Sequence, residues 1–322
     1  MPLSNMKVFN EYLKRTTIET LAQDVEKFNA SSRGAIRLTT QGIDGDFLQE
    51  SFWAGLHGAQ RRVDRYAANG AQASTPLSQK QYDSVKIAGG FGPIIWEPSQ
   101  LSWVQKNPEE ALEVISRNLS ESIMADQLNT AIAALVAAIG NQPGATNDVS
   151  ATAGVSYGAI NNAHALFGDA SQRLVAQVMN GAMYHKLIGQ NLVNAERLFT
   201  FTGVQVVDIL GKAVIVTDSP ALSEAGTPDK QKVLSLTDGA AVVMDGSDLI
   251  TNIETSNGKE RIETTMQADY TFGLGLKGFT WDTTNGGKSP TNAELATGTN
   301  WDLVANSIKA SAGVLTIGDA DK

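Results

Sequence analysis

The three histidines are the first residues to consider for chemistry, because the chain contains no cysteine. The absence of cysteine excludes disulfides, thiolate metal sites and cysteine nucleophiles. His57, His164 and His185 stand in separate helix-like stretches, and none belongs to an H-E-x-x-H or similar spacing. Any one of them could ligate a metal or act as a general base, but isolated positions of this kind favour surface or interface histidines.

Two glycine-containing patterns resemble ligand-binding motifs in their letters. Gly273-Leu-Gly275-Leu-Lys-Gly278 matches G-x-G-x-x-G, but a dinucleotide site needs these glycines between a strand and a helix N-terminus. The surrounding sequence alternates like a strand, which favours close backbone approach or a bulge. Asp245-Gly-Ser-Asp248 resembles part of a calcium loop without the remaining spacing. We therefore predict no catalytic residue, no metal site and no cofactor, and we expect that the protein is not an enzyme.

Charged residues offer a different kind of chemistry, which is contact between protein surfaces. Arg61, Arg62 and Arg65 are the densest basic group in an otherwise acidic chain. One interpretation is a solvated strand face, and the other is a patch that pairs with carboxylates of an adjacent subunit. Glu109 and Glu110 stand where a helix dipole favours negative charge. The predicted inter-subunit contact residues are Arg61, Arg62, Arg65, Tyr82, Glu109 and Glu110.

The composition limits the class of protein. The chain has 322 residues, 42% of them hydrophobic, and a net charge of −9. A protein that binds nucleic-acid phosphates is usually basic. Because this chain is acidic, sequence-specific nucleic-acid binding is not expected. The N-terminus lacks the apolar core of a signal peptide, and no run approaches ~18 uninterrupted apolar residues. We expect a soluble protein that is made inside the cell and has no membrane partner.

The stretch from Asn107 to Gly140 is the longest predicted element. Pro108 suits the first helical position, Asn107 is a good N-cap, and Gly140 could supply a left-handed helix end. Apolar residues recur at three- and four-residue spacing between these signals. A helix over 108–139 would be roughly 48 Å long at ~1.5 Å per residue, so we interpret it as a rod across a flat, extended subunit.

The segment before this helix predicts an arm. Residues 60–98 have strand-like runs around Val63 and around Val85 and Ile87, with a polar stretch between them. A loop this long is usually functional or disordered. The segment can therefore be interpreted either as a flexible surface hairpin or as a two-stranded arm. Because an isolated hairpin is marginal in water, an arm would need a neighbouring copy to order it.

The remaining chain predicts a mixture of helices and strands. Residues 1–33 form an amphipathic pattern that needs a partner surface, which could be a neighbouring subunit, and Phe47 to Leu56 reads as another apolar helical face. Further expected elements are a helix over 157–167, a helix over 183–188 capped by Asn180, and strands over 173–179, 204–209, 212–217, 232–236, 240–244, 259–281 and 314–317. The simplest assembly is an α+β fold.

Taken together, these stretches resemble the major capsid proteins of tailed bacteriophages, which have the Hong Kong 97-type fold. The resemblance lies in the order of the parts and in local matches: SQRLVAQVMNGAMYHKLIGQ (171–190), LGKAVIVTDSP (210–220), NPEE before the long helix, and the strand ending in GFTW (278–281). It covers roughly residues 35–285.

The resemblance implies a division of the chain and a set of partners. The implied parts are an N-terminal arm and helix (1–59), an extended loop (60–98), a peripheral domain (99–154 and 256–285) with spine helix 108–139, an axial domain (155–255) and a C-terminal segment (286–322). Copies would form hexamers and pentamers of an icosahedral virion shell around double-stranded DNA, without sequence-specific contact. A separate scaffolding protein, expected because the arm begins directly at Met1, a portal and a decoration protein are the implied partners.

Two other functions remain open at this point. The same fold builds encapsulin-type nanocompartments, which would enclose a protein cargo and no DNA. An enzyme on an α/β scaffold would instead need a pocket with convergent titratable groups, and the sequence offers no such constellation.

Overall fold

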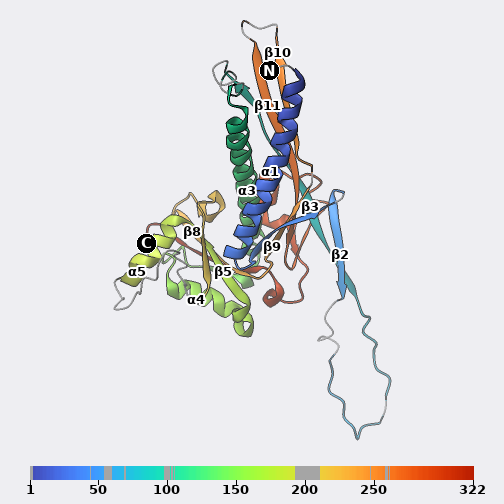
Figure 1. Ribbon diagram of the computed structural model, residues 1–322. Coiled ribbons are helices and arrows are strands. Elements are labelled where there is room, and N and C mark those ends of the chain that lie inside the picture. The colour runs from blue at the N-terminus through green and yellow to red at the C-terminus, as the bar shows by residue number, and fades with distance from the viewer. Residues whose placement is uncertain are drawn as a thin grey trace.

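The computed structural model describes residues 3–43, 45–53, 60–68, 70–97, 102, 104, 106–192, 211–246, 248–257, 260 and 262–322. The molecule is elongated (Figure 1), with long helices and strands side by side at one end and a thin arm at the other. A second, smaller group of strands and helices lies to one side. The predicted strand 204–209 and His57 lie outside the described residues.

The first sheet has six strands and runs the length of the body. Its order is β1-β9-β11-β3-β2, with β10 paired to β11, and only the β1–β9 pair is parallel. The longest partners are β3 and β11, which pair from Leu274 opposite Val85 to Thr264 opposite Trp96. The bounds are β1 Ile36–Gly42, β2 Phe47–Trp53, β3 Gln79–Trp96, β9 Ala241–Asp245, β10 Ile250–Ser256 and β11 Glu263–Leu276.

Helix α3 (Pro108–Gly140) confirms the predicted rod. Fourteen of its residues are buried, including Ile132, Leu135 and Ile139 at 0% exposure. Its length and apolar composition would also suit a membrane span, but 56% of its apolar window is buried inside the fold, as in the core helix of a soluble protein. The rod therefore serves as one wall of the core.

The signals predicted for the ends of α3 are confirmed in part. Asn107 occupies the N-cap position and Pro108 begins the helix, but the predicted side-chain cap and the left-handed glycine end were wrong. Asn107 makes no side-chain capping bond, and the helix ends on Asn141 in an ordinary right-handed conformation (φ −75°). The Asn141 N–H donates to the Ala137 carbonyl at 3.1 Å, and Thr146 Oγ1 donates to the Ile139 carbonyl at 3.0 Å. Because these donors satisfy terminal carbonyls, no left-handed glycine is required.

Helix α1 (Leu3–Ser31) lies along α3 of the same chain (Figure 1). Its Leu13 and Thr17 are fully buried and Phe9 is 6% exposed. The amphipathic segment thus finds its partner surface within its own body, and no neighbouring subunit is needed to cover that face.

The segment 47–53 is a strand, so the predicted helical face over 47–56 was wrong. β2 pairs antiparallel with β3 from Phe47 opposite Val85 to Trp53 opposite Gln79. The backbone bonds to β3, which is distant in the sequence, override the local apolar spacing. Val63, predicted to lie in a strand, has no regular structure and is 65% exposed.

The second six-stranded sheet forms the side group in Figure 1, with order β4-β14-β8-β5-β6 and β7 paired to β8. As predicted, Asn180 caps a helix, because the Met183 N–H donates to Asn180 Oδ1 at 2.8 Å. β9 and β10 fall inside the implied axial segment 155–255 but pair in the first sheet, whereas β4 and β14 lie outside it and pair in the second. The bounds are β4 Thr146–Asp148, α4 Tyr157–Leu166, β5 Leu174–Met179, α5 Gly181–Leu192, β6 Ala213–Val216, β7 Ser223–Glu224, β8 Lys230–Thr237 and β14 Gly313–Asp319.

The C-terminal residues close the body with small elements. Trp281 and Trp301 pack edge to face with ring centroids 4.9 Å apart, and each is at most 1% exposed. The elements are β12 Phe279–Trp281, α6 Asn292–Leu295 and β13 Trp301–Leu303, with short 3-10 turns at Pro143–Ala145, Gly168–Arg173, Pro220–Leu222, Gly298–Asn300 and Ile308–Ala310.

Candidate inter-subunit surfaces

The arm extends from the body and exposes its side chains. β2 and β3 form its base, and the chain then extends well beyond the body (Figure 1). Every described side chain from 60 to 78 is exposed. These include Val63 at 65%, Tyr66 at 93% and Leu77 at 53% exposure. Because the rest of the described chain leaves these apolar side chains uncovered, the arm is a candidate contact surface for another molecule.

The three predicted arginines all lie on this arm. Arg61 Nη1 donates to Gln72 Oε1 at 3.2 Å, across the arm. The Tyr66 N–H donates to Asp64 Oδ1 at 2.9 Å, which forms a local turn. Three arginines and Asp64 give residues 60–68 a net charge of +2 in a chain of net charge −9. The patch is solvated in the single copy, and its proposed role is contact with a neighbour.

Tyr82 and the acidic pair Glu109 and Glu110 lie in different places. Tyr82 is half-buried on β3 and its hydroxyl donates to Glu50 on β2. Burial, together with the Glu50 carboxylate, raises the pKa of Tyr82 above its ordinary value. Glu109 and Glu110 are exposed in the first turn of α3, at the end of the molecule opposite the arm (Figure 1). The arm arginines therefore cannot meet these glutamates within one copy.

A groove of about 780 Å³ lies beside the base of the arm. Strands β2, β3, β9 and β11 supply its floor, and the segment 304–310 forms one wall. Tyr82 and Glu50 stand at its arm end, and Arg37, Asp238 and Lys277 at its other end. Asp238 accepts from Arg37 Nη2 at 2.6 Å through its carboxylate and from Lys277 Nζ at 2.8 Å through its carbonyl. Burial lowers the pKa of Lys277.

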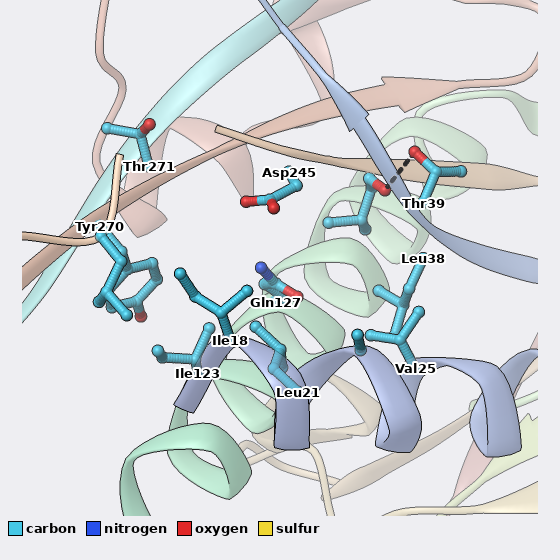
Figure 2. Close-up of a pocket in the computed structure, with 13 residues that line it drawn as sticks. Ile18, Leu21, Val25, Leu38, Thr39, Ile123, Gln127, Asp245, Tyr270 and Thr271 are labelled. Carbon is cyan, nitrogen blue, oxygen red and sulfur yellow. Dashed lines mark hydrogen bonds between the residues drawn. The ribbon is translucent and has the colours of Figure 1, made fainter. Parts of the chain in front are cut away.

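A second pocket of about 210 Å³ lies between α1, α3 and the first sheet (Figure 2). Aliphatic side chains such as Ile18, Leu21 and Val25 dominate its lining. The phenol of Tyr270 donates to Asp126 Oδ2 at 2.6 Å, and burial together with Asp126 raises the Tyr270 pKa. This bond ties β11 to α3, so the polar groups of the pocket hold two elements together and form no nucleophile–base pair.

The remaining chemical candidates have structural partners. His164 Nε2 lies 2.9 Å from Ser235 Oγ in the buried interior, and burial lowers the pKa of His164. His185 packs edge to face on Tyr184 at 5.4 Å. Asp248 accepts from Lys86 at 2.8 Å and from Thr271 at 2.9 Å. Within the described residues, no group of three histidine, aspartate or glutamate side chains could hold a metal ion.

The G-x-G-x-x-G letters fall in a strand and a turn, as the sequence context indicated. Gly273 and Gly275 belong to β11, and Gly278 has φ +81° in the turn before β12. Because no helix follows the motif, its amides do not form an anion site at a helix N-terminus.

Comparison with known proteins shows the family of this chain. A family model described as Gp13-like, major capsid protein 13-like, matches residues 5–315. The chain belongs to this family of major capsid proteins. The resemblance found in the sequence is thereby confirmed, and the protein is a structural subunit of a capsid shell in the virion.

The chain is also similar to solved structures of phage capsids and of an encapsulin. A chain of the cyanophage Pam1 capsid asymmetric unit aligns with a TM-score of 0.50 and 12% identity over 88% of each chain. A chain of Microbacterium phage Oxtober96 gives 0.48 and 12% over 90% of each chain. The SrpI encapsulin of Synechococcus elongatus PCC 7942 gives 0.48 and 9%, over 88% of this chain and 84% of that one. Among curated proteins, no sequence matches this capsid protein.

Sequence reasoning missed the groove. Its lining comes from segments around residues 37, 50, 82, 240, 275 and 305, which no short spacing connects. The one local signal was the glycine pattern at 273–278, whose interpretation as close backbone approach is confirmed by the geometry of Gly275 and Gly278.

Proposed function

We propose that copies of this capsid protein form hexamers and pentamers that close an icosahedral shell around double-stranded DNA, each copy laying its arm on a neighbour. The observation that carries this proposal is the arm itself. Residues 60–78 are exposed wherever they are described and include Tyr66 at 93% exposure. A segment that gains nothing from its own core must gain contacts elsewhere to be held in one conformation.

The position of the arm favours closed rings. It leaves the body at one end, whereas the first turn of α3 lies at the other (Figure 1). A contact between the arm and a different surface of the next copy is heterologous, and heterologous contacts close into rings when the rotation between copies permits it. Pairing of Arg61, Arg62 and Arg65 with carboxylates of the next copy would orient the approach more than it would strengthen binding.

The charge of the chain suits a wall around DNA. A net charge of −9 gives little attraction for phosphates, so the genome is enclosed without sequence-specific contact. We infer that the chain acts without catalysis, is made in the host cytoplasm, and assembles with a separate scaffolding protein, a portal and a decoration protein.

Electron microscopy of the purified chain, alone and with co-expressed phage proteins, tests this proposal. We expect closed shells of hexamers and pentamers, filled with DNA when the packaging proteins are present. Shells that enclose a protein cargo and never DNA would support the nanocompartment function instead. A chain that remains monomeric under every condition would contradict both.

Charge reversal on the arm tests how the copies meet. We expect Arg62→Asp to reduce shell yield at least several-fold while the unfolding midpoint of the free subunit stays unchanged. The matched control is Arg117→Asp, because Arg117 is also exposed and pairs with Glu121 on its own helix at 3.0 Å. Normal shells from Arg62→Asp would remove the arginine patch from the assembly contact.

A further inference from the structure

Two glycines, Gly275 and Gly278, line part of the groove beside the arm base. A Cβ on Gly275 would stand 2.5 Å from Ser84 Oγ. At Gly278 a Cβ would stand 2.9 Å from the Ser311 Cα, and the positive φ of +81° also favours glycine there. At these two positions neighbouring atoms leave no room for a larger side chain, so the glycines contribute backbone to the lining of the groove.

The lining of the groove is apolar between two polar ends. Leu48, Val242, Met244, Val304 and Ala305 line its length. Glu50 at the arm end adds a carboxylate that accepts from the Tyr82 hydroxyl, and a carboxylate keeps acceptor capacity after one such bond. Asp238 at the far end accepts from Arg37 and Lys277. A fitting occupant would present an apolar or aromatic side chain next to a cation that can reach Glu50.

The arm carries this combination. Tyr66 has the highest exposed fraction among the exposed large hydrophobic side chains, 93%, and it follows Arg65 directly. Tyrosine and arginine are enriched among the residues that dominate binding energy at interfaces. The arm of the same copy extends away from the body (Figure 1) and its described side chains are exposed, so it does not fill its own groove.

We infer that the groove is the receptor for the arm of a second copy, with Tyr66 seated between Leu48, Val242 and Ala305 and Arg65 directed to Glu50. This inference rests on the proposed function and specifies which surface receives the arm. Each copy would then lay its arm at the base of the next copy's arm, a head-to-tail contact that can repeat around a ring.

Disulfide trapping between copies tests this inference, because the chain has no cysteine of its own. Tyr66→Cys and Ala305→Cys chains, tagged differently in mass, are co-expressed with excess unmodified chain so that shells still close, and are then oxidised. We expect a mixed disulfide between the two tagged chains, at least tenfold more abundant than the one formed when Glu121→Cys replaces Ala305→Cys. Glu121 is the control because it is exposed on the outer side of α3.

Two results would overturn the inference while the proposed function stands. One is shells in which Tyr66→Cys cross-links equally to both sites, and the other is cross-linking of Ala305→Cys to a co-expressed scaffolding protein instead of a second copy. Absence of shells from the unmodified chain would contradict the proposed function itself.

As a second readout, Ala305→Trp should fill the groove and reduce shell yield at least several-fold with an unchanged unfolding midpoint, and Tyr66→Gly in the same chain should restore part of that yield.

Discussion

The arm and the second sheet differ in how much of their side-chain surface the chain itself buries. In β8, the five residues from Val233 to Thr237 are all buried, with strands on both sides. In the arm, residues 60–78 are exposed throughout their described length. One region is ordered by its own core, and the other, in the proposal above, offers its side chains to a neighbouring copy. The comparison predicts that substitutions can change stability and assembly separately.

The largest expected difference comes from one substitution made in both regions. Leu234→Ala in β8 removes a side chain with 0% exposure, and should lower the free energy of unfolding by about 2–5 kcal/mol. Leu77→Ala on the arm, where the side chain is 53% exposed, should change it by less than about 0.5 kcal/mol. Denaturant unfolding of the unassembled subunit measures both. A cost for Leu77→Ala comparable to that of Leu234→Ala would mean that the arm packs on its own body.

A second pair of matched substitutions removes one hydroxyl from each region. Tyr270→Phe deletes the 2.6 Å bond to Asp126, so we expect the free energy of unfolding to fall by about 1–2 kcal/mol. Tyr66→Phe deletes a hydroxyl at the surface of the arm and should leave the free subunit unchanged. If both variants unfold like the original chain, the link between β11 and α3 contributes nothing to the stability of the body.

The smallest expected effect is a dependence of the unfolding free energy on pH that arises from the buried His164 of α4. Burial lowers the folded-state pKa of His164 below its unfolded value of 6.5. The folded state then binds fewer protons than the unfolded state, so the stabilising contribution is present above about pH 6.5 and is lost as the pH falls below it. His164→Gln can still bond to Ser235, and should flatten the dependence of unfolding free energy on pH between about 7 and 5.

The control for this prediction is His185→Gln, because His185 is exposed beside Tyr184. We expect His185→Gln to leave the dependence of the unfolding free energy on pH unchanged. An unchanged pH profile in His164→Gln would assign the acid sensitivity to other groups, such as the carboxylate of Asp148. That carboxylate accepts from the Ser150 N–H and lies 3.7 Å from Lys230 Nζ, and its pKa is lowered through the Ser150 bond and Lys230 despite partial desolvation.

The sequence predicted the elements whose signals are local. Apolar spacing located α3 almost to the residue, and Asn180 identified the cap of α5. It failed for Phe47 to Trp53, because that segment is a strand only through its pairing with β3, at least 26 residues away in sequence. It also failed at Asn141, where the end of α3 depends on Thr146 from the following turn.

Of the two candidate surfaces, the arginine group could be predicted from the sequence and the groove could not. The arginine group on the arm is visible in the sequence because its members are neighbours. The groove could not be predicted, since Arg37, Glu50, Val242 and Ala305 come together only after the first sheet has formed and the segment 304–310 lies beside it. Tyr82, one of the predicted contact residues, bonds to Glu50 at the groove.

Hydrogen–deuterium exchange of residues 60–78 in free subunits and in closed shells tests the central claim most directly. The amides of β8 serve as the internal reference, since that strand pairs with β5 and β14 in every copy. We predict fast exchange of the arm in the free subunit, strong protection in the shell, and slow exchange of β8 in both. Arm amides that exchange equally fast in closed shells, or that are already protected in the free subunit, would contradict the account.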